Sequence, residues 1–124
     1  MKLDHYSVRT NELDAVKDFF CDVADLQPGD RPPFKFPGYW LYDAETGAAI
    51  VHLIGIDNTP GDSTGAADHM AFTGDGARYD AIAEKVLALP YPHEMRTVPG
   101  RGLRQIFVTG PHGLVVELNF PPPD

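Results

Sequence analysis

Hydrophobic positions along the chain follow two periodicities, and the order in which they occur repeats. Apolar residues spaced three and four apart over residues 13–24 predict a helix with one buried face, and the same spacing recurs over residues 79–87. A short run rich in β-branched and aromatic residues precedes each helix, at residues 3–9 and 68–73. The pattern therefore predicts the order strand–helix twice.

Three further segments of strand-like composition follow each predicted helix. They cover residues 31–38, 39–43 and 48–56 in the first half and residues 93–98, 103–109 and 114–120 in the second half. Gln27–Asp30 is expected to end the first helix, with Thr10 or Asn11 as its capping residue. Residues 31–38 are so rich in proline that an edge strand or a loop suits them better than a central strand.

Each half is thus predicted to be a β-α-β-β-β module. Residues 58–66 have the Gly, Pro, Asp and Ser content of a linker between the two modules. Because one such module rarely buries its apolar face alone, we expect modules 1–57 and 67–120 to pair within a single domain of residues 1–124. The expected fold class is α+β, with a curved eight-stranded mixed sheet and the helices on its outer face.

Composition narrows the possible partners. The net charge of −8 and the pI near 4.9 argue against nucleic acids and anionic membranes, which both reward basic patches. Cys21 is the only cysteine, so a disulfide framework is excluded and a reducing compartment is favoured. No apolar run is long enough for a membrane span or a signal peptide, and we expect a cytoplasmic protein.

Four side chains capable of binding a metal occupy matching positions in the two modules. His5 and His69 each follow an aspartate at the start of a predicted strand, 64 residues apart. His52 comes 47 residues after His5, and Glu117 comes 48 residues after His69. Each of these two later residues interrupts an apolar strand pattern, where a buried polar side chain requires a hydrogen-bond partner or a metal. A pseudo-twofold relation between the modules would bring all four together.

Each residue also has a structural explanation when it is taken alone. His5 is also consistent with a solvent-exposed strand residue, His52 with a histidine bonded to a core carbonyl, and His69 with a strand cap. Glu117 is also consistent with an ion pair to Arg104 across a hairpin. The coincidence of all four at repeat positions favours the joint prediction of one site. Three imidazoles and one carboxylate suit Fe(II), Mn(II), Co(II), Ni(II) or Zn(II).

These segments give the chain a resemblance to a known family over nearly its whole length. The Asp-His strand starts, the helix from Asn11 to Phe20 and the ending from Gln105 to Leu118 resemble the vicinal oxygen chelate superfamily. That superfamily includes glyoxalase I, methylmalonyl-CoA epimerase, extradiol ring-cleaving dioxygenases, and fosfomycin and bleomycin resistance proteins. Its paired βαβββ fold agrees with the modules predicted above.

The resemblance also implies a ligand set. The ending is similar to the signature Phe-x-x-Asp-Pro-Asp-Gly-x-x-x-Glu-Leu, in which Glu117 matches the metal-ligating Glu, although Gly110 and His112 replace the two residues that flank the proline. His5 and His69 match the two strand-start ligands. His52 falls where glyoxalase I has a Glu and where other members have a different ligand or none.

What the resemblance implies about activity is a divalent-metal enzyme acting on a small substrate with vicinal oxygens. The triad of His5, His69 and Glu117 resembles the ligands of extradiol dioxygenases, which favours catechol-type dioxygenation with Fe(II) or Mn(II). A fourth ligand at His52 instead favours glyoxalase- or epimerase-like lyase or isomerase chemistry, for which Glu117 is the base candidate. A drug-binding protein without catalysis is a second alternative, against which the retained ligand set counts.

The remaining candidates surround this predicted centre. His93 and Tyr42 are further acid/base candidates, and Trp40, Phe72, Arg104 and Phe107 are candidates for contact with the substrate. Arg96, Arg101 and Arg104 are candidates for binding a substrate carboxylate or phosphate, although a solvated surface charge is the favoured explanation for at least two of them. Because a small paired sheet leaves open edges, we expect a homodimer.

Overall fold

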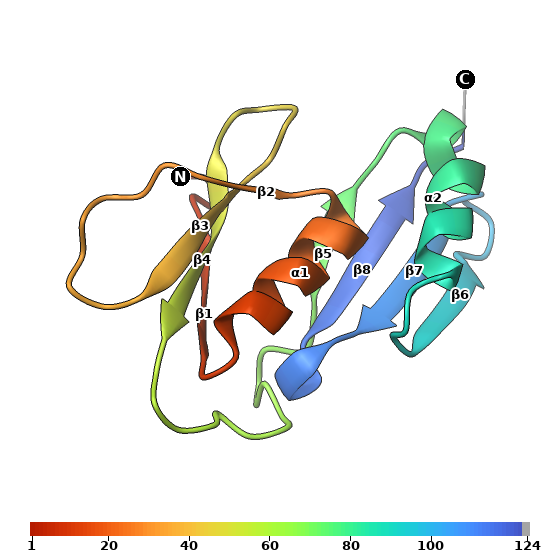
Figure 1. Cartoon of the computed structure of the whole chain (residues 1–124). Helices are drawn as coiled ribbons and strands as arrows, with labels where there is room; N and C mark the ends of the chain where they lie inside the picture. Colours follow the sequence, from red (N-terminus) through yellow and green to blue (C-terminus); the bar gives the residue numbers. More distant parts are fainter. Residues whose placement is uncertain (123–124) are drawn as a thin grey trace. The chain divides into compact units, whose positions relative to one another are not determined.

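The structure is a computed structural model that describes residues 1–122. The chain divides into two compact units, Met1–Ser63 and Thr64–Asp124, and the boundary falls inside the segment predicted to be a linker. In the described residues, each unit contains one α-helix and one four-stranded mixed sheet (Figure 1). None of the helices in the described part of the chain is long and apolar enough to cross a membrane.

The first unit has the predicted β-α-β-β-β order. Its elements are β1 (Tyr6–Thr10), α1 (Leu13–Ala24), β2 (Gln27–Gly29), β3 (Gly38–Tyr42) and β4 (Ala49–Gly55). The strands lie in the order β1-β4-β3-β2, with β1 parallel to β4 and the other neighbours antiparallel. A parallel pair requires a long connection, and α1 together with β2 and β3 provides it.

One face of this sheet packs against α1 and the other face does not. Val16, Phe19, Phe20 and Val23 are the buried face of α1, as the spacing of apolar residues predicts. The helix contacts β3 and β4, and the strand residues Val8, Leu41, Val51 and Leu53 of this unit are also buried. Because side chains alternate along a strand, Ser7, Trp40 and His52 lie on the opposite face of the sheet. The candidate histidine is therefore outside the α1 core.

Two details of this unit differ from the prediction. The edge strand β2 is Gln27–Gly29, which the sequence pattern assigns to the end of the helix, whereas residues 31–37 form a loop. Pro28 is tolerated there because only one side of an edge strand forms a ladder. The N-cap of α1 is Glu12 and not Thr10 or Asn11. Thr10 remains in β1, where its Oγ1 accepts a hydrogen bond from the Glu12 amide at 2.8 Å.

The second unit repeats the same order of elements. It contains β5 (Met70–Thr73), the short 3-10 helix η1 (Gly76–Arg78), α2 (Tyr79–Leu87), β6 (His93–Thr97), β7 (Arg104–Thr109), the turn η2 (Pro111–Gly113) and β8 (Val115–Phe120). The strand order is β5-β8-β7-β6, with β5 parallel to β8. This pair of modules confirms the predicted α+β fold class.

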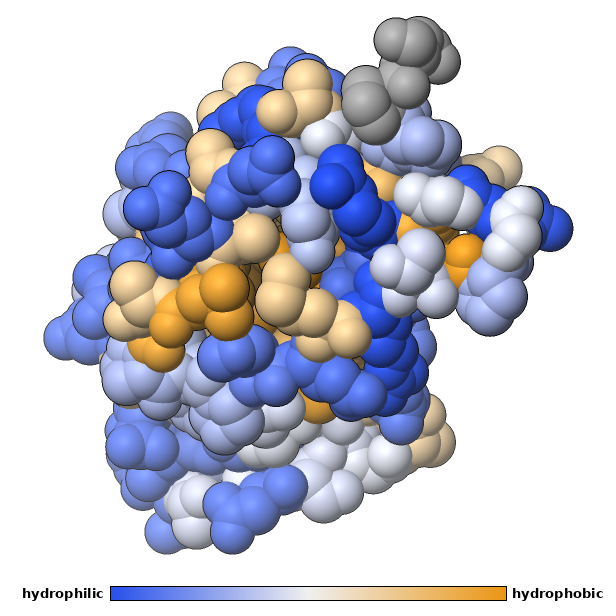
Figure 2. All heavy atoms as spheres, turned by 90° about the vertical axis from the view of Figure 1, so that its right-hand side faces the viewer, coloured by the Kyte–Doolittle hydropathy of each residue, from blue (hydrophilic) through white to orange (hydrophobic). Residues whose placement is uncertain are grey.

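The core of the second unit lies on the α2 side of its sheet. Ala83 and Val86 of α2 are buried, as are Ile106, Val108, Val116, Leu118 and Phe120 of the strands. The ring of Tyr79, at the start of α2, meets the ring of Phe120 edge-on at 5.4 Å. The surface shown in Figure 2 is largely hydrophilic with small hydrophobic patches, in keeping with the net charge of −8.

The strand register shows that equivalent residues of the two units occupy equivalent positions in their sheets. In the first unit Ser7, two residues after His5, is paired with His52. In the second unit Ala71, two residues after His69, is paired with Glu117. The next strand places Trp40 beside His52 and Phe107 beside Glu117. His52 and Glu117 therefore occupy the same position of two equivalent sheets, each on the face away from the helix.

Candidate functional site

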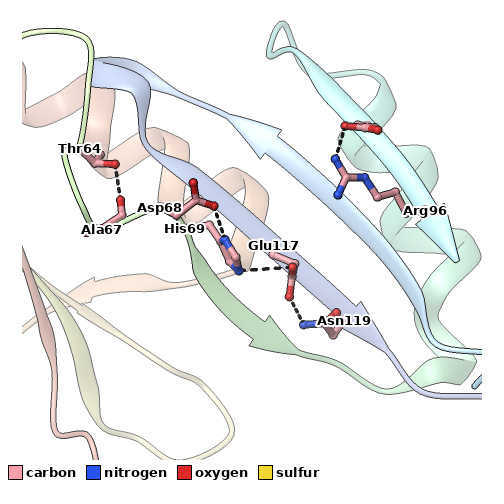
Figure 3. Close-up of polar contacts among 8 residues, drawn as sticks. Thr64, Ala67, Asp68, His69, Arg96, Glu117 and Asn119 are labelled. Carbon is pink, nitrogen blue, oxygen red and sulfur yellow. Dashed lines mark hydrogen bonds and ion pairs between the residues drawn. The ribbon is translucent and has the colours of Figure 1, made fainter. Parts of the chain in front are cut away.

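In the second unit the side chains of His69 and Glu117 point toward each other. The Nε2 atom of His69 lies 3.5 Å from Oε1 of Glu117. On the other side of the ring, Nδ1 of His69 donates a hydrogen bond to the Asp68 carboxylate at 2.8 Å (Figure 3). When Nδ1 carries the proton, the neutral ring has its lone pair on Nε2, which faces Glu117. Asp68 thereby orients the ring for ligation.

Glu117 is held by a chain of amide side chains. Its Oε2 accepts a hydrogen bond from Nδ2 of Asn119 at 2.6 Å (Figure 3). Oδ1 of Asn119 in turn accepts a hydrogen bond from Nε2 of Gln105 at 3.0 Å. Glu117 is only 8% exposed, although it is an acidic residue. The two amides fix one carboxylate oxygen and leave Oε1 directed at His69.

This arrangement is electrostatically incomplete without a cation. A neutral His69 presents a lone pair to the lone pairs of a carboxylate, so a proton or a metal ion is needed between the two atoms. The distance of 3.5 Å exceeds that of an ordinary hydrogen bond. It suits two ligands of a single ion, since nitrogen and oxygen ligands lie about 2.1 Å from metals such as zinc.

A cavity of about 600 Å³ opens beside this pair, within the second unit. Its lining includes His69, Glu117, His93, Arg96, Gln105 and Phe107. The guanidinium of Arg96 lies 4.5 Å from the centre of the Phe107 ring and donates a hydrogen bond to Glu94 at 2.8 Å. This contact lowers the pKa of the Glu94 carboxyl. The cavity thus combines one cation and one aromatic face with the His69–Glu117 pair.

The first unit prepares His5 in the same way as His69. Nδ1 of His5 donates a hydrogen bond to the Asp4 carboxylate at 2.6 Å, and this bond is the main reason that the pKa of Asp4 is lowered. The lone pair of the neutral His5 ring is then on Nε2. The side chain of His5 is 38% exposed, the same fraction as that of His69. The Asp-His dipeptide is therefore a repeated structural device.

His52 is arranged differently from its counterpart Glu117. Its ring lies between two other rings, with centroids 4.1 Å from Trp40 and 3.9 Å from His5. Its Nε2 donates a hydrogen bond to the carbonyl of Ala49 at 3.0 Å. Burial of the ring, and secondarily the nearby His5, lower the pKa of His52. The neutral ring is therefore the favoured form.

The structure thus brings the predicted ligands together as two pairs, His5 with His52 and His69 with Glu117. In neither unit, over residues 1–122, do three or more His, Cys, Asp or Glu side chains gather in a way that could hold a metal ion. The four-residue ligand set remains a prediction. The alternative pairing of Glu117 with Arg104 is not found, because Arg104 lies 3.9 Å from the centre of the Tyr79 ring and donates to the carbonyl of Gly76.

The other predicted residues are divided between the cavity and different surroundings. His93 and Phe107 line the cavity. Phe72 is paired with Leu118, so its side chain is on the face opposite Glu117. The hydroxyl of Tyr42 donates a hydrogen bond to the carbonyl of Asp30, and Trp40 stacks on His52.

The sequence pattern did not identify the residues that hold the Glu117 carboxylate in place. Asn119 and Gln105 were not among the predicted site residues, although the alternation of β8 places residues 117 and 119 on one face. The register of β7 with β8 then sets Gln105 beside Asn119. Alternation alone identifies the first of these residues, but the second depends on a register that the sequence does not specify.

The comparisons with known proteins agree with this architecture. The model of the Glyoxalase/Bleomycin resistance protein/Dioxygenase superfamily matches residues 2–118. The chain therefore belongs to this superfamily, the vicinal oxygen chelate proteins that its sequence resembles. A search among curated protein sequences gives no match.

Solved structures of the same fold have low sequence identity to this chain. The fosfomycin resistance protein FosX from Listeria monocytogenes is 15% identical with a TM-score of 0.73, covering 97% of this chain and 93% of that protein. A glyoxalase/dioxygenase from Nostoc punctiforme is 18% identical with a TM-score of 0.76, covering 98% and 91%. A FosX variant, 16% identical with a TM-score of 0.71 and coverage of 99% and 92%, is described as complexed with Mn(II) and 1S,2S-dihydroxypropylphosphonic acid.

Proposed function

We propose that this protein is a divalent-metal-dependent enzyme that acts on a small substrate with two adjacent oxygen atoms. The observation that carries the proposal is the approach of His69 Nε2 to Glu117 Oε1 at 3.5 Å. Each of the two side chains has its other polar atom bonded elsewhere, to Asp68 and to Asn119. The two free donor atoms are thus prepared for one cation.

The proposed ligands are His69 and Glu117 of the second unit together with His5 of the first unit. His5 is a suitable third ligand because Asp4 orients it as Asp68 orients His69. Two histidines and one carboxylate suit Fe(II) or Mn(II), with Co(II), Ni(II) and Zn(II) as alternatives. The Mn(II) complex of FosX, a protein of the same fold, supports a divalent ion of this type.

When bound, the metal supplies Lewis-acid or redox chemistry to two neighbouring substrate oxygens. The residues of the chain then select and orient the substrate. Phe107 presents an aromatic ring against which a planar substrate group can pack. Arg96, whose guanidinium lies over the Phe107 ring, presents a positive charge to a substrate carboxylate or phosphonate. His93, which lines the same cavity, is an acid/base candidate of the second unit.

Two reactions are compatible with this assembly. We place extradiol-type cleavage of a catechol first, because a set of two histidines and one carboxylate leaves positions open for substrate and dioxygen. Lyase or isomerase chemistry without dioxygen is the second candidate. The FosX complex with a vicinal diol favours it, and in that case Glu117 is the candidate base.

Reconstitution of the metal-free protein distinguishes these reactions. Protein prepared without metal is loaded under nitrogen with Fe(II), Mn(II), Co(II), Ni(II) or Zn(II), and each sample is assayed with catechols under oxygen and with hemithioacetals and epoxides without it. Oxygen uptake only with Fe(II) or Mn(II) supports ring cleavage. Turnover without oxygen assigns the protein to the lyases or isomerases. Failure of every ion to bind refutes the proposal and favours a non-catalytic binding protein.

A further inference from the structure

We propose that His52 positions His5 by ring stacking and is not itself a metal ligand. The inference rests on the proposed metal site for its functional meaning, but the stack that carries it lies entirely within the first unit. Three rings are involved, those of Trp40, His52 and His5. The consequence is a triad of two histidines and one carboxylate in place of four protein ligands.

The stack covers both faces of the His52 ring. The planes of Trp40 and His52 are 9° apart with centroids at 4.1 Å, and those of His52 and His5 are 13° apart with centroids at 3.9 Å. Parallel rings at these separations are in van der Waals contact. Trp40 lies on β3 and is paired directly with His52 on β4, so two neighbouring strands form a platform on which His5 rests.

The same geometry excludes joint ligation by His5 and His52. An imidazole binds a metal through a lone pair that lies in the plane of its ring, at about 2.1 Å. Because the two ring planes are nearly parallel and their centroids 3.9 Å apart, an ion in the plane of His5 lies well outside the plane of His52. In addition, Nε2 of His52 donates to Ala49.

The comparison of the two repeats supports this assignment. Glu117, at the position equivalent to His52, approaches its histidine end-on at 3.5 Å, atom to atom. His52 approaches its histidine face-on. The same register position therefore supplies a ligand in the second unit and a supporting surface in the first. A supporting surface limits the orientations that His5 can adopt before it binds an ion.

Two variants separate the stacking role of the His52 ring from any role of its nitrogen atoms as ligands. His52→Phe keeps an aromatic surface but cannot ligate, whereas His52→Ala removes both. His112→Asn is the matched control, because His112 lies in the η2 turn of the second unit with a φ of 60°, a conformation that asparagine tolerates. His5→Ala is the reference for loss of a ligand. Circular dichroism checks that every variant folds.

Two measurements are made on each variant. Nuclear magnetic resonance of the metal-free protein records the chemical shifts of the ring protons of His5. The ring current of a stacked neighbour changes these chemical shifts. A titration with Mn(II), in which electron paramagnetic resonance measures the free ion, gives the affinity of each variant for Mn(II). We expect His52→Phe to keep the displaced His5 signals and an affinity close to that of the parent. We expect His52→Ala to lose the displacement and to bind Mn(II) about 10–100-fold more weakly.

Loss of metal from His52→Phe equal to that from His5→Ala overturns the proposal, because His52 is then a ligand. Unchanged His5 signals and affinity in His52→Ala also overturn it. A parent protein that binds no Mn(II) or other tested ion refutes the proposed function, while the His5 signals still decide whether the stack exists. If His52→Ala does not fold, the variants Trp40→Ala and Trp40→Phe are compared instead, because Trp40 covers the other face of the His52 ring. We then expect the chemical shifts of the His5 ring protons to change in Trp40→Ala and not in Trp40→Phe.

Discussion

The Nε2 atom of His69, the residue that precedes β5, lies 3.5 Å from the Oε1 atom of Glu117 on β8. The pairing of β5 with β8 creates this approach, because it places Ala71 beside Glu117 and so sets the start of β5 over the carboxylate. The contact joins two acceptors in the neutral state of the histidine. The most direct test of whether this pair binds a metal ion is therefore to change the charge of one of the two side chains.

Glu117→Gln is expected to lower the metal content of the purified protein severely, because a neutral amide is a much poorer ligand than a carboxylate. His69→Ala should have the same effect. Elemental analysis after dialysis against the metal provides the measurement. Glu94→Gln is the matched control, since Glu94 lines the same cavity but is paired with Arg96. Equal metal content in all these proteins would contradict the assignment.

The aspartate that precedes each histidine is expected to tune metal affinity without binding the ion. Asp68→Ala should weaken binding about 10–100-fold while leaving the stoichiometry intact at saturating metal, because the His69 ring loses its orienting partner. Asp68→Asn, which still accepts the hydrogen bond from Nδ1, should weaken it less. Asp4 should give the same graded series for His5.

Titration calorimetry measures both series. Asp43→Asn serves as the control, since the Asp43 carboxylate accepts hydrogen bonds from Glu45 and Thr46 in a turn of the first unit. An affinity that is unchanged in Asp68→Ala would show that the ring of His69 does not depend on its aspartate.

The stability of the metal-free protein is expected to fall as the pH falls below about 6.5, in part because of His52. Burial lowers the pKa of His52 in the folded protein, so the unfolded chain takes up its proton at a higher pH. Between the two pKa values the unfolded state binds more protons, and the free energy of unfolding decreases toward acid pH. His5 and Trp40 cover the two faces of the ring.

Urea unfolding of the parent and of His52→Phe between pH 7.5 and 5 tests this expectation. The variant should show a shallower loss of stability toward acid pH. Identical slopes for the two proteins would mean that His52 keeps its ordinary pKa in the folded state.

The sequence specifies the scaffold of this site better than its details. The two helices and seven of the eight strands in the described part of the chain lie where the sequence pattern predicts them. The strand β2 was placed wrongly, since Gln27, Pro28 and Gly29 are all exposed and have no apolar pattern to reveal them.

The same limit applies to the chemistry. The repeat of Asp-His marks His5 and His69 as equivalent residues, and in the structure Glu117 lies 3.5 Å from His69. The ring orientation of His52 was beyond prediction, because it depends on the register that places Trp40 beside it. Spacing identifies which residues approach each other but not whether they meet by an edge or by a face.

The last prediction concerns assembly. Each sheet has two edge strands, and an unpaired edge exposes backbone donors and acceptors that a second chain can cover. We expect a homodimer, with a sedimentation mass twice that of the 13.6 kDa chain throughout the micromolar range. A single-chain mass across that range would refute the expectation.

Mixed dimers of His5→Ala and His69→Ala then show which chains share a metal. Each variant alone lacks one proposed ligand in every centre, and each should bind little metal. If a centre combines the first unit of one chain with the second unit of its partner, a mixed dimer contains one centre with both ligands intact, and metal binding recovers on mixing. If each centre belongs to one chain, every centre of the mixed dimer carries one defect, and no recovery occurs. Double-variant chains mixed with themselves provide the baseline, because they retain no intact centre under either arrangement.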